Sequence, residues 1–320
     1  MPGRRRNLAA LIVGVFLARC AFSPPSAFPQ SKRTKSDADI SKIGHRKITT
    51  DVNFYSPENE LKLGKQLAQE VERSSKVIND SMVIAYVNQL GQKIAQNSDA
   101  RFPITVRVID AETISAFTLP GGPQYIDKAL ILQTETEAEL AGVLAYGIAL
   151  TALRAGTRDA SKGQVMQLAT IPLILLGPGG WGGNTRLRQA NFAIPLIYLK
   201  FQRNLVFDAD YFGIQYLYKS GYDPESMPHF FERVWPSTLA GPKAAPETFS
   251  PYPPLQDRLK AMRTEIHGTL PHRDTSTVST SEFENLKQHL RTWNLPNPKD
   301  ADASKPILRK STSNCGPDQR

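Results

Sequence analysis

Hydrophobic residues recur every three or four positions through much of the chain, and this spacing predicts a mainly helical domain. One such stretch begins at Ser56 and Pro57, which suit the cap and first position of a helix, and ends near Arg73. A second stretch follows directly and places four apolar residues on one helical face: Val83, Val87, Leu90 and Ile94. These patterns predict two amphipathic helices at the start of the domain.

The pattern then changes from helical spacing to alternation, which is typical of a strand. In PITVRVID, the residues Ile104, Val106 and Val108 fall on one face. The next segment, SAFTLPGGPQYID, reads as two short extended pieces joined at a Pro-Gly-Gly turn. We therefore expect a small sheet within a mainly helical α+β domain.

The second half of the domain returns to helical spacing. Thr136 and Glu139 form a capping box before an apolar run that ends near Leu153, which predicts a helix buried on most sides. ATIPLILLGPGGWGGN, around Trp181, is interpreted as a flexible excursion between helices. Further helices are expected in LIYLKFQRNLVFDADYFGIQYLYKS, from Pro224 to Val234, from Leu255 to Ile266, and around Phe283, Leu286, Leu290 and Trp293.

The ends of the sequence differ from this central region, residues 51–293. Residues 1–30 join three arginines to an apolar run and then to prolines, as an export signal does; a buried N-terminal helix is the alternative. Arg19 disfavours lipid attachment at Cys20 without excluding it. We assign residues 31–50 to a polar basic linker with a peripheral membrane contact open to it, and 294–320 to a disordered tail.

Composition narrows the classes of function. The formal net charge is +9, yet no basic stripe carries interleaved aromatic residues, so nucleic-acid binding is excluded. Cys20 and Cys315 are the only cysteines, and they lie in the two end segments, so no disulfide framework is expected. The signal places the protein in the periplasm or otherwise in association with the bacterial envelope.

Four segments in succession resemble the HtpX-like, BepA-like and CAAX prenyl protease family of zinc metallopeptidases: SAFTLPGGPQYI, ETEAELAGVLAYGIAL, FQRNLVFDADYFGIQYLYKSGYDP and YPPLQDRL. Order, spacing and flanking residues match those of the family. The resemblance implies a zincin-like domain whose small sheet borders a catalytic cleft. In active members, two histidines of a His-Glu-x-x-His helix and a glutamate from a second helix bind zinc, and the intervening glutamate is the general base.

This sequence departs from the family at every one of those positions. By the resemblance, the first histidine is replaced by Tyr146, the general base by Gly147 and the second histidine by Leu150. The third ligand is replaced by Val206, and the histidine of the His-Pro loop by Tyr252. Leucine and valine cannot bind zinc and glycine has no base, so we expect no metal, no cofactor and a catalytically inactive domain. The five histidines of the chain offer no clear replacement pair.

Asp210 is the one residue of the family site that remains, and the resemblance implies that it once oriented the first histidine. A buried carboxylate needs a partner. The Tyr146 hydroxyl or an arginine such as Arg203 is therefore expected to satisfy it, unless Asp210 simply faces solvent.

Three functions stay open at this point. Phe117, Thr118 and Leu119 match the strand that borders the family's cleft, and such an edge can bind an extended envelope polypeptide without metal, although the segment can equally be ordinary core. The domain can instead be an active metalloendopeptidase with an unrecognised metal site. It can also be a scaffold that docks to an active paralogue or an envelope assembly through the cleft rim or the Trp181 loop.

Overall fold

The computed structural model describes residues 35–48, 53–165, 174–176, 196–239 and 252–293. The helices and strands within these ranges are α1 (Lys35–Ala38), the 3-10 helix η1 (Ile40–Lys42), α2 (Pro57–Ser74), α3 (Ser81–Gln96), β1 (Thr105–Ile109), β2 (Ala116–Thr118), β3 (Pro123–Asp127), α4 (Lys128–Gln133), α5 (Glu137–Ala152), α6 (Ala155–Val165), β4 (Ile174–Leu176), α8 (Leu196–Lys219), α9 (Ser226–Leu239), α10 (Leu255–Gly268) and α11 (Ser281–Thr292). The expected α+β fold, mainly helical with a small sheet, is confirmed.

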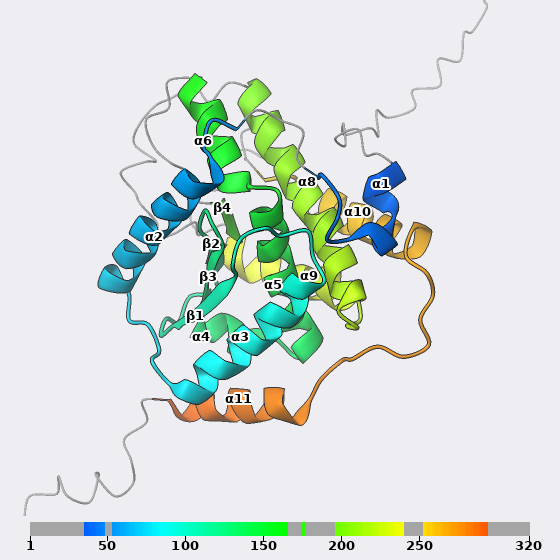
Figure 1. The fold of residues 1–320 in the computed structure, drawn as a ribbon. Coiled ribbons are helices and arrows are strands. Elements are labelled where there is room, and N and C mark those ends of the chain that lie inside the picture. The colour runs from blue at the N-terminus through cyan, green and yellow to red at the C-terminus, as the bar shows by residue number, and fades with distance from the viewer. Residues whose placement is uncertain (1–34, 49–52, 166–173, 177–195, 240–251, 294–320) are drawn as a thin grey trace, which may run out of the picture.

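Helix α5 lies at the centre of the fold, with the sheet on one side and α8 on the other (Figure 1). Every residue of α5 is buried, which explains why its sequence is apolar all round. The predicted cap is present, since the Thr136 hydroxyl accepts a hydrogen bond of 3.2 Å from the Glu139 amide. The helix ends at Ala152, and two residues beyond it Arg154 has a φ of 52° although it is not a glycine.

In the part of the chain that the structure describes, the sheet has four strands in the order β1-β3-β2-β4. β1 and β3 are parallel, while β2 runs antiparallel to both β3 and β4. The Pro-Gly-Gly turn joins β2 to β3 as the sequence predicts, and Gly121 and Gly122 both have positive φ values, which glycine adopts at low cost. β4 was not predicted, because it lies within the segment interpreted as a flexible excursion.

The outer side of β1 is closed by polar groups. The Asn88 side chain of α3 both donates to the carbonyl and accepts from the amide of Val106, at 2.9 Å each. Ile78 N donates to Val108 O and Asp110 N donates to Lys76 O, both at 2.8 Å. Polar groups from α3 and from the segment around Ile78 therefore already bind the outer backbone of β1 at Val106 and Val108.

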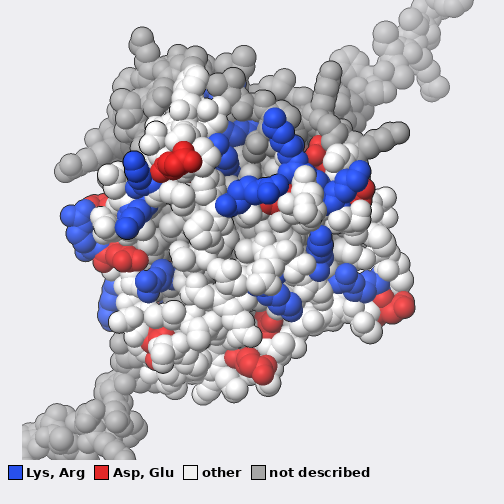
Figure 2. Space-filling view, viewed as in Figure 1, with Lys and Arg blue, Asp and Glu red and all other residues white. Residues whose placement is uncertain are grey.

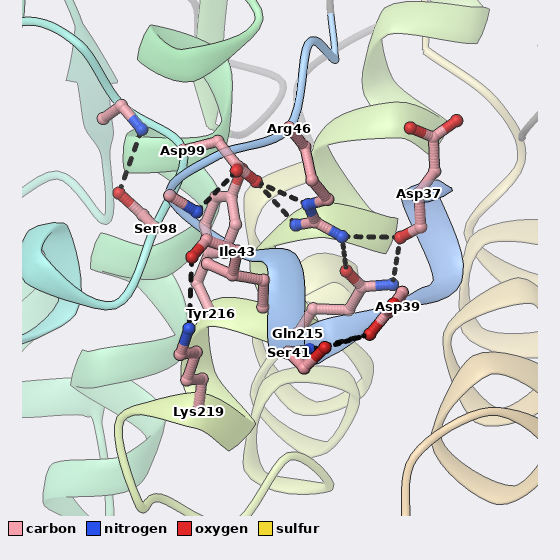
Figure 3. Close-up of polar contacts among 12 residues, drawn as sticks. Asp37, Asp39, Ser41, Ile43, Arg46, Ser98, Asp99, Gln215, Tyr216 and Lys219 are labelled. Carbon is pink, nitrogen blue, oxygen red and sulfur yellow. Dashed lines mark hydrogen bonds and ion pairs between the residues drawn. The ribbon is translucent and has the colours of Figure 1, made fainter. Parts of the chain in front are cut away.

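Residues 35–48 pack against the domain and are not the solvated linker that the sequence predicted (Figure 3). The Arg46 side chain is fully buried and donates through Nε and Nη2 to Asp99 Oδ2, at 3.0 and 2.6 Å. Its Nη1 donates to Gln215 Oε1 of α8 at 2.6 Å, and Tyr216 donates to the same Asp99 oxygen at 2.9 Å. Buried ion pairs are stable only when hydrogen bonds satisfy both partners, and this one is so satisfied.

The C-terminal helix α11 runs beneath α3 and α4 (Figure 1). Its cap is Thr280, and Phe283, Leu286 and Leu290, around which the sequence predicts this helix, are buried. The export signal, Cys20, the Trp181 loop and the tail from 294 lie outside the described residues.

The hydropathy of the helices and the distribution of surface charge both bear on contact with a membrane. No single helix in the described ranges has the length and hydropathy of a membrane span; the bent pair Glu137–Ala152 and Ala155–Lys162, angled at 50°, meets both criteria together. Figure 2 shows lysine and arginine side chains gathered over the upper half of one face, with acidic side chains among them. The peripheral membrane contact stays a prediction.

Candidate functional site

The general-base position, Gly147, lies on the face of α5 that packs against the sheet. A Cβ atom on Gly147 would lie 2.7 Å from Thr118 Oγ1 and 3.0 Å from both Cδ and Oε1 of Gln124. Thr118 and Gln124 are cross-strand partners in β2 and β3, so their side chains reach α5 together. The space that a base would need is therefore filled by side chains of the sheet.

Gln124 fills this space at a cost. Its side chain is 3% exposed, and within the described ranges its Nε2 is buried without a hydrogen-bond partner. A buried unsatisfied donor costs about 1–3 kcal/mol. The Gln124 side chain therefore occupies the space beside Gly147 despite the unfavourable burial of its amide nitrogen.

The retained carboxylate, Asp210, is deeply buried on α8 and is held by Arg258 of α10. Arg258 donates through Nε and Nη2 to the two oxygens of Asp210, at 2.8 and 2.6 Å, and both side chains are at most 2% exposed. Such two-pronged pairing is the strongest geometry for a guanidinium and a carboxylate. Asp210 does not face solvent, and a cation from the protein already balances its charge.

Aromatic rings surround this ion pair. The Arg258 guanidinium lies 5.4 Å from the ring centroid of Tyr146 and 4.7 Å from that of Phe231 of α9. Tyr146 and Phe231 meet edge to face with centroids 6.0 Å apart. Cation–π contacts of this kind are stronger when both partners are removed from water.

The charges of this ion pair and of Tyr252 also change the pKa values of the groups at the site. Burial raises the pKa of Tyr146 far above its usual value, Arg258 opposes this, and the negative charges of Asp210 and Tyr252 add to it. Asp210 and the two tyrosines likewise raise the pKa of Arg258, against the effect of burial. Of the predicted set, Tyr146 and Asp210 thus both lie beside Arg258, and the raised pKa keeps the phenol of Tyr146 neutral at physiological pH.

Leu150 and Val206 are each 3% exposed and belong to α5 and α8, the two helices that pack closely at the centre. The two helices lie close together at Gly213, where a Cβ atom would lie 3.2 Å from Tyr146 Cα and 3.3 Å from Tyr146 N. Direct contact between Leu150 and Val206 stays a prediction. Their burial is that of ordinary apolar core.

Sequence reasoning named Arg203 and overlooked Arg258 as a partner of Asp210. The missed signal is in the pattern of α10: Arg258 follows Leu255 by three positions and precedes Met262 by four, so it lies on the apolar face of its helix. A lone arginine on such a face needs a buried carboxylate.

The candidate peptide-binding edge is corrected by the sheet order. β2 carries Phe117 and Thr118 and lies between β3 and β4, so it is an interior strand and its backbone is not free. Phe117 and Leu119 are buried in a cluster on the α2 side of the sheet, where the Phe117 ring stacks on Tyr125 with centroids 5.2 Å apart. Only Thr118 of the three points to α5 and the former base position.

The residues present do not fit the zinc that the resemblance implies. Zinc sites need at least three His, Cys, Asp or Glu side chains that converge. No such group exists in the described ranges. Four of the histidines pair with carboxylates that do not belong to α5: His229 and His267 approach Glu225, at 4.0 and 3.1 Å, while His289 approaches Asp80 and His272 approaches Asp274.

The central buried helix, the sheet beside it and the crossing helix with its retained aspartate define a metallopeptidase-like domain. Residues 83–266 match peptidase family M48, so the chain belongs to this family. Among curated proteins it is 28% identical over 232 residues to a beta-barrel assembly-enhancing protease of Yersinia pestis, covering 69% of this chain and 47% of that protein.

Two other relatives show the same range of similarity. The beta-barrel assembly-enhancing protease of Escherichia coli (strain K12) is 26% identical over 220 residues, 66% of this chain and 45% of the relative. The mitochondrial metalloendopeptidase OMA1 of Danio rerio is 27% identical over 192 residues, 56% of this chain and 38% of the relative. The chain spans about half the length of the curated relatives it matches.

Proposed function

We propose that this chain is a catalytically inactive member of family M48 that binds extended polypeptides of the bacterial envelope. The observation that carries the proposal is the packing at Gly147. A general base there must project from a position where even a Cβ atom overlaps Thr118 and Gln124. The side chains of Thr118 and Gln124 thus occupy the position of the lost base. Replacing Gly147 alone by glutamate would therefore not restore a working base.

The electrostatics of the ion pair support the same conclusion. A buried carboxylate beside a catalytic metal normally gains from the charge of that metal. Here Arg258 supplies a full positive charge at hydrogen-bond distance from both oxygens of Asp210. A divalent cation placed nearby would be repelled by the guanidinium, and Tyr146, Leu150 and Val206 would offer it at most one neutral phenol.

The proposed client class rests on the relatives. Their names describe proteases that enhance β-barrel assembly. If this domain works in the same compartment, the clients that it meets are envelope polypeptides that have not yet folded. The predicted export signal agrees with that location. An unfolded β-barrel strand is extended and alternates apolar and polar residues, which suits binding by backbone hydrogen bonds at a sheet.

The test uses the full chain without its signal and an unfolded outer-membrane β-barrel protein in urea dilution. We expect saturable binding by fluorescence anisotropy and no cleavage on gels, with zinc added or with a chelator. Cleavage that a chelator abolishes would overturn inactivity and favour the alternative, an active metalloendopeptidase with an unrecognised metal site. Absence of binding, together with co-purification of an active paralogue, would favour a scaffold role instead.

A further inference from the structure

We propose that β4 is an internal occupant of the polypeptide-binding edge, and that clients bind by replacing it along β2. This inference rests on the proposed function and identifies where its clients bind. β4 pairs antiparallel with β2 over three residues, in the register Ala116 with Leu176, Phe117 with Leu175 and Thr118 with Ile174. The chain's own segment therefore already demonstrates the geometry in which β2 accepts an added strand.

The place of β4 in the sheet connects it with the former active site. Thr118 contacts α5 at Gly147 through its side chain and pairs with Ile174 of β4 through its backbone register. A polypeptide in the place of β4 would thus lie one strand away from the Gly147 position. This is the edge that sequence analysis assigned to clients, with β4 covering it.

The two ends of the sheet are held very differently. β1 is fixed on its outer side by the Asn88 side chain and by the backbone around Ile78, in addition to its pairing with β3. Among the residues that the structure describes, β4 pairs with one neighbour over three residues and is the outermost strand of the sheet. Short, one-sided pairings open at low free energy, so exchange at this end is far easier than at the other.

The exchange conserves backbone hydrogen bonds, because a client strand makes the bonds that β4 gives up. Its balance depends on the effective concentration of the tethered β4, typically millimolar for a flexible connection, and on how many residues the client pairs. The composition of β4, Ile-Leu-Leu, indicates the preferred client: an uncharged extended segment rich in aliphatic residues that runs antiparallel to β2.

A disulfide that locks β4 onto β2 tests the inference. Thr118→Cys and Ile174→Cys are combined in a chain whose Cys20 and Cys315 are replaced by serine, so that only the new pair can oxidise. Directly opposed residues in an antiparallel pair have Cβ atoms about 4.5–5.5 Å apart, so a small approach of the two strands brings them within the roughly 3.5–4.5 Å that a disulfide spans. Failure of this pair to oxidise in a folded protein would contradict the observed register and overturn the inference.

The probe is a fluorescein-labelled peptide that copies residues 170–178, extended by lysines for solubility. We expect the oxidised variant to bind it roughly tenfold or more weakly than the reduced variant, since tethering by the disulfide removes the exchange. The single-cysteine variants should show no such redox dependence. Equal binding before and after oxidation would overturn the inference.

A second variant acts in the opposite direction and does not depend on a disulfide. Leu175→Pro removes a backbone donor and disfavours the strand in β4 without changing β2. It should bind the peptide more tightly than the unaltered chain, and unchanged or weaker binding would count against β4 as the occupant.

The same variants separate this inference from the proposed function. If oxidised and reduced chains bind an unfolded β-barrel protein equally well, the binding function stands and its assignment to β2 is wrong. If neither state binds that protein, the proposed function itself fails.

Discussion

Replacing Gly147 by alanine should destabilise the fold, although the same change stabilises most helices. In a helix interior, alanine is favoured over glycine by about 0.5–1 kcal/mol. At Gly147 the added Cβ would lie 2.7 Å from Thr118 Oγ1 and 3.0 Å from two atoms of Gln124. Threonine is restricted at χ1, and overpacking of a core costs about 1–3 kcal/mol, so we expect a net loss of about 1–2 kcal/mol.

The assay is urea unfolding followed by circular dichroism, with Gly268→Ala as the matched control. Gly268 is the last residue of α10, and nothing lies within 4 Å of a Cβ atom placed there. The control should be neutral or slightly stabilising. In a background with Thr118→Ala and Gln124→Ala, Gly147→Ala should likewise become neutral or stabilising, because the overlapping atoms are gone.

The reasoning is refuted if Gly147→Ala is as stable as the unaltered chain or more stable, or if its cost persists in the double-alanine background. Either result would mean that the sheet does not fill the general-base position. In that case, restoring the family motif would need only the lost zinc ligands and general base. If Gly147→Ala is instead destabilising as expected, restoration must also replace Thr118 and Gln124 by smaller residues.

Three further changes test the buried charges. Arg258→Met should cost about 3–5 kcal/mol by leaving Asp210 buried and unpaired, and thermal melts should recover most of that loss when Asp210→Leu is added. Arg46→Met should cost a similar amount, about 3–5 kcal/mol, through the loss of a partner for Asp99, whereas solvated-linker behaviour would leave the melting temperature unchanged. Burial raises the pKa of Asp127 from 3.8 to about 6, so ionisation of its carboxyl lowers the stability of the fold as the pH rises through this window. Asp127→Asn should therefore stabilise the fold by up to about 3 kcal/mol at pH 7 and by little below pH 4. Equal effects at both pH values would refute this.

Helices were predictable where local signals agree with the fold. Thr136 and Glu139 mark the start of α5, and its apolar surface matches its burial on all sides. The same holds for α2, whose Ser56 cap and Pro57 start are both present. Capping and periodicity are local properties, so the sequence carries them in full.

The features that sequence reasoning missed depend on partners far along the chain. Arg46 looks like a solvated linker residue until Asp99 and Gln215 surround it. Arg258 looks like a surface arginine until Asp210 meets it across two helices. Polar residues acquire such partners only through tertiary packing, so the pattern of α10 can indicate that Arg258 is buried but cannot identify Asp210 as its partner.

The sheet shows a third kind of limit. β4 is a three-residue strand within an apolar run that contains proline, and its assignment depends wholly on pairing with β2. Because β4 was missed, β2 was mistaken for an edge. The family resemblance drew attention to α5 and α8, but it could not reveal that Thr118 and Gln124 of the sheet pack against Gly147.

Zinc content is the most direct measurement of the central claim that this M48 domain has no catalytic metal. The mature chain is equilibrated with excess zinc, dialysed, and analysed for metal by mass spectrometry beside an active M48 peptidase treated identically. We expect the active peptidase to retain stoichiometric zinc and this chain to retain only a small fraction. Stoichiometric zinc in this chain, removed by a chelator together with a proteolytic activity, would contradict the claim.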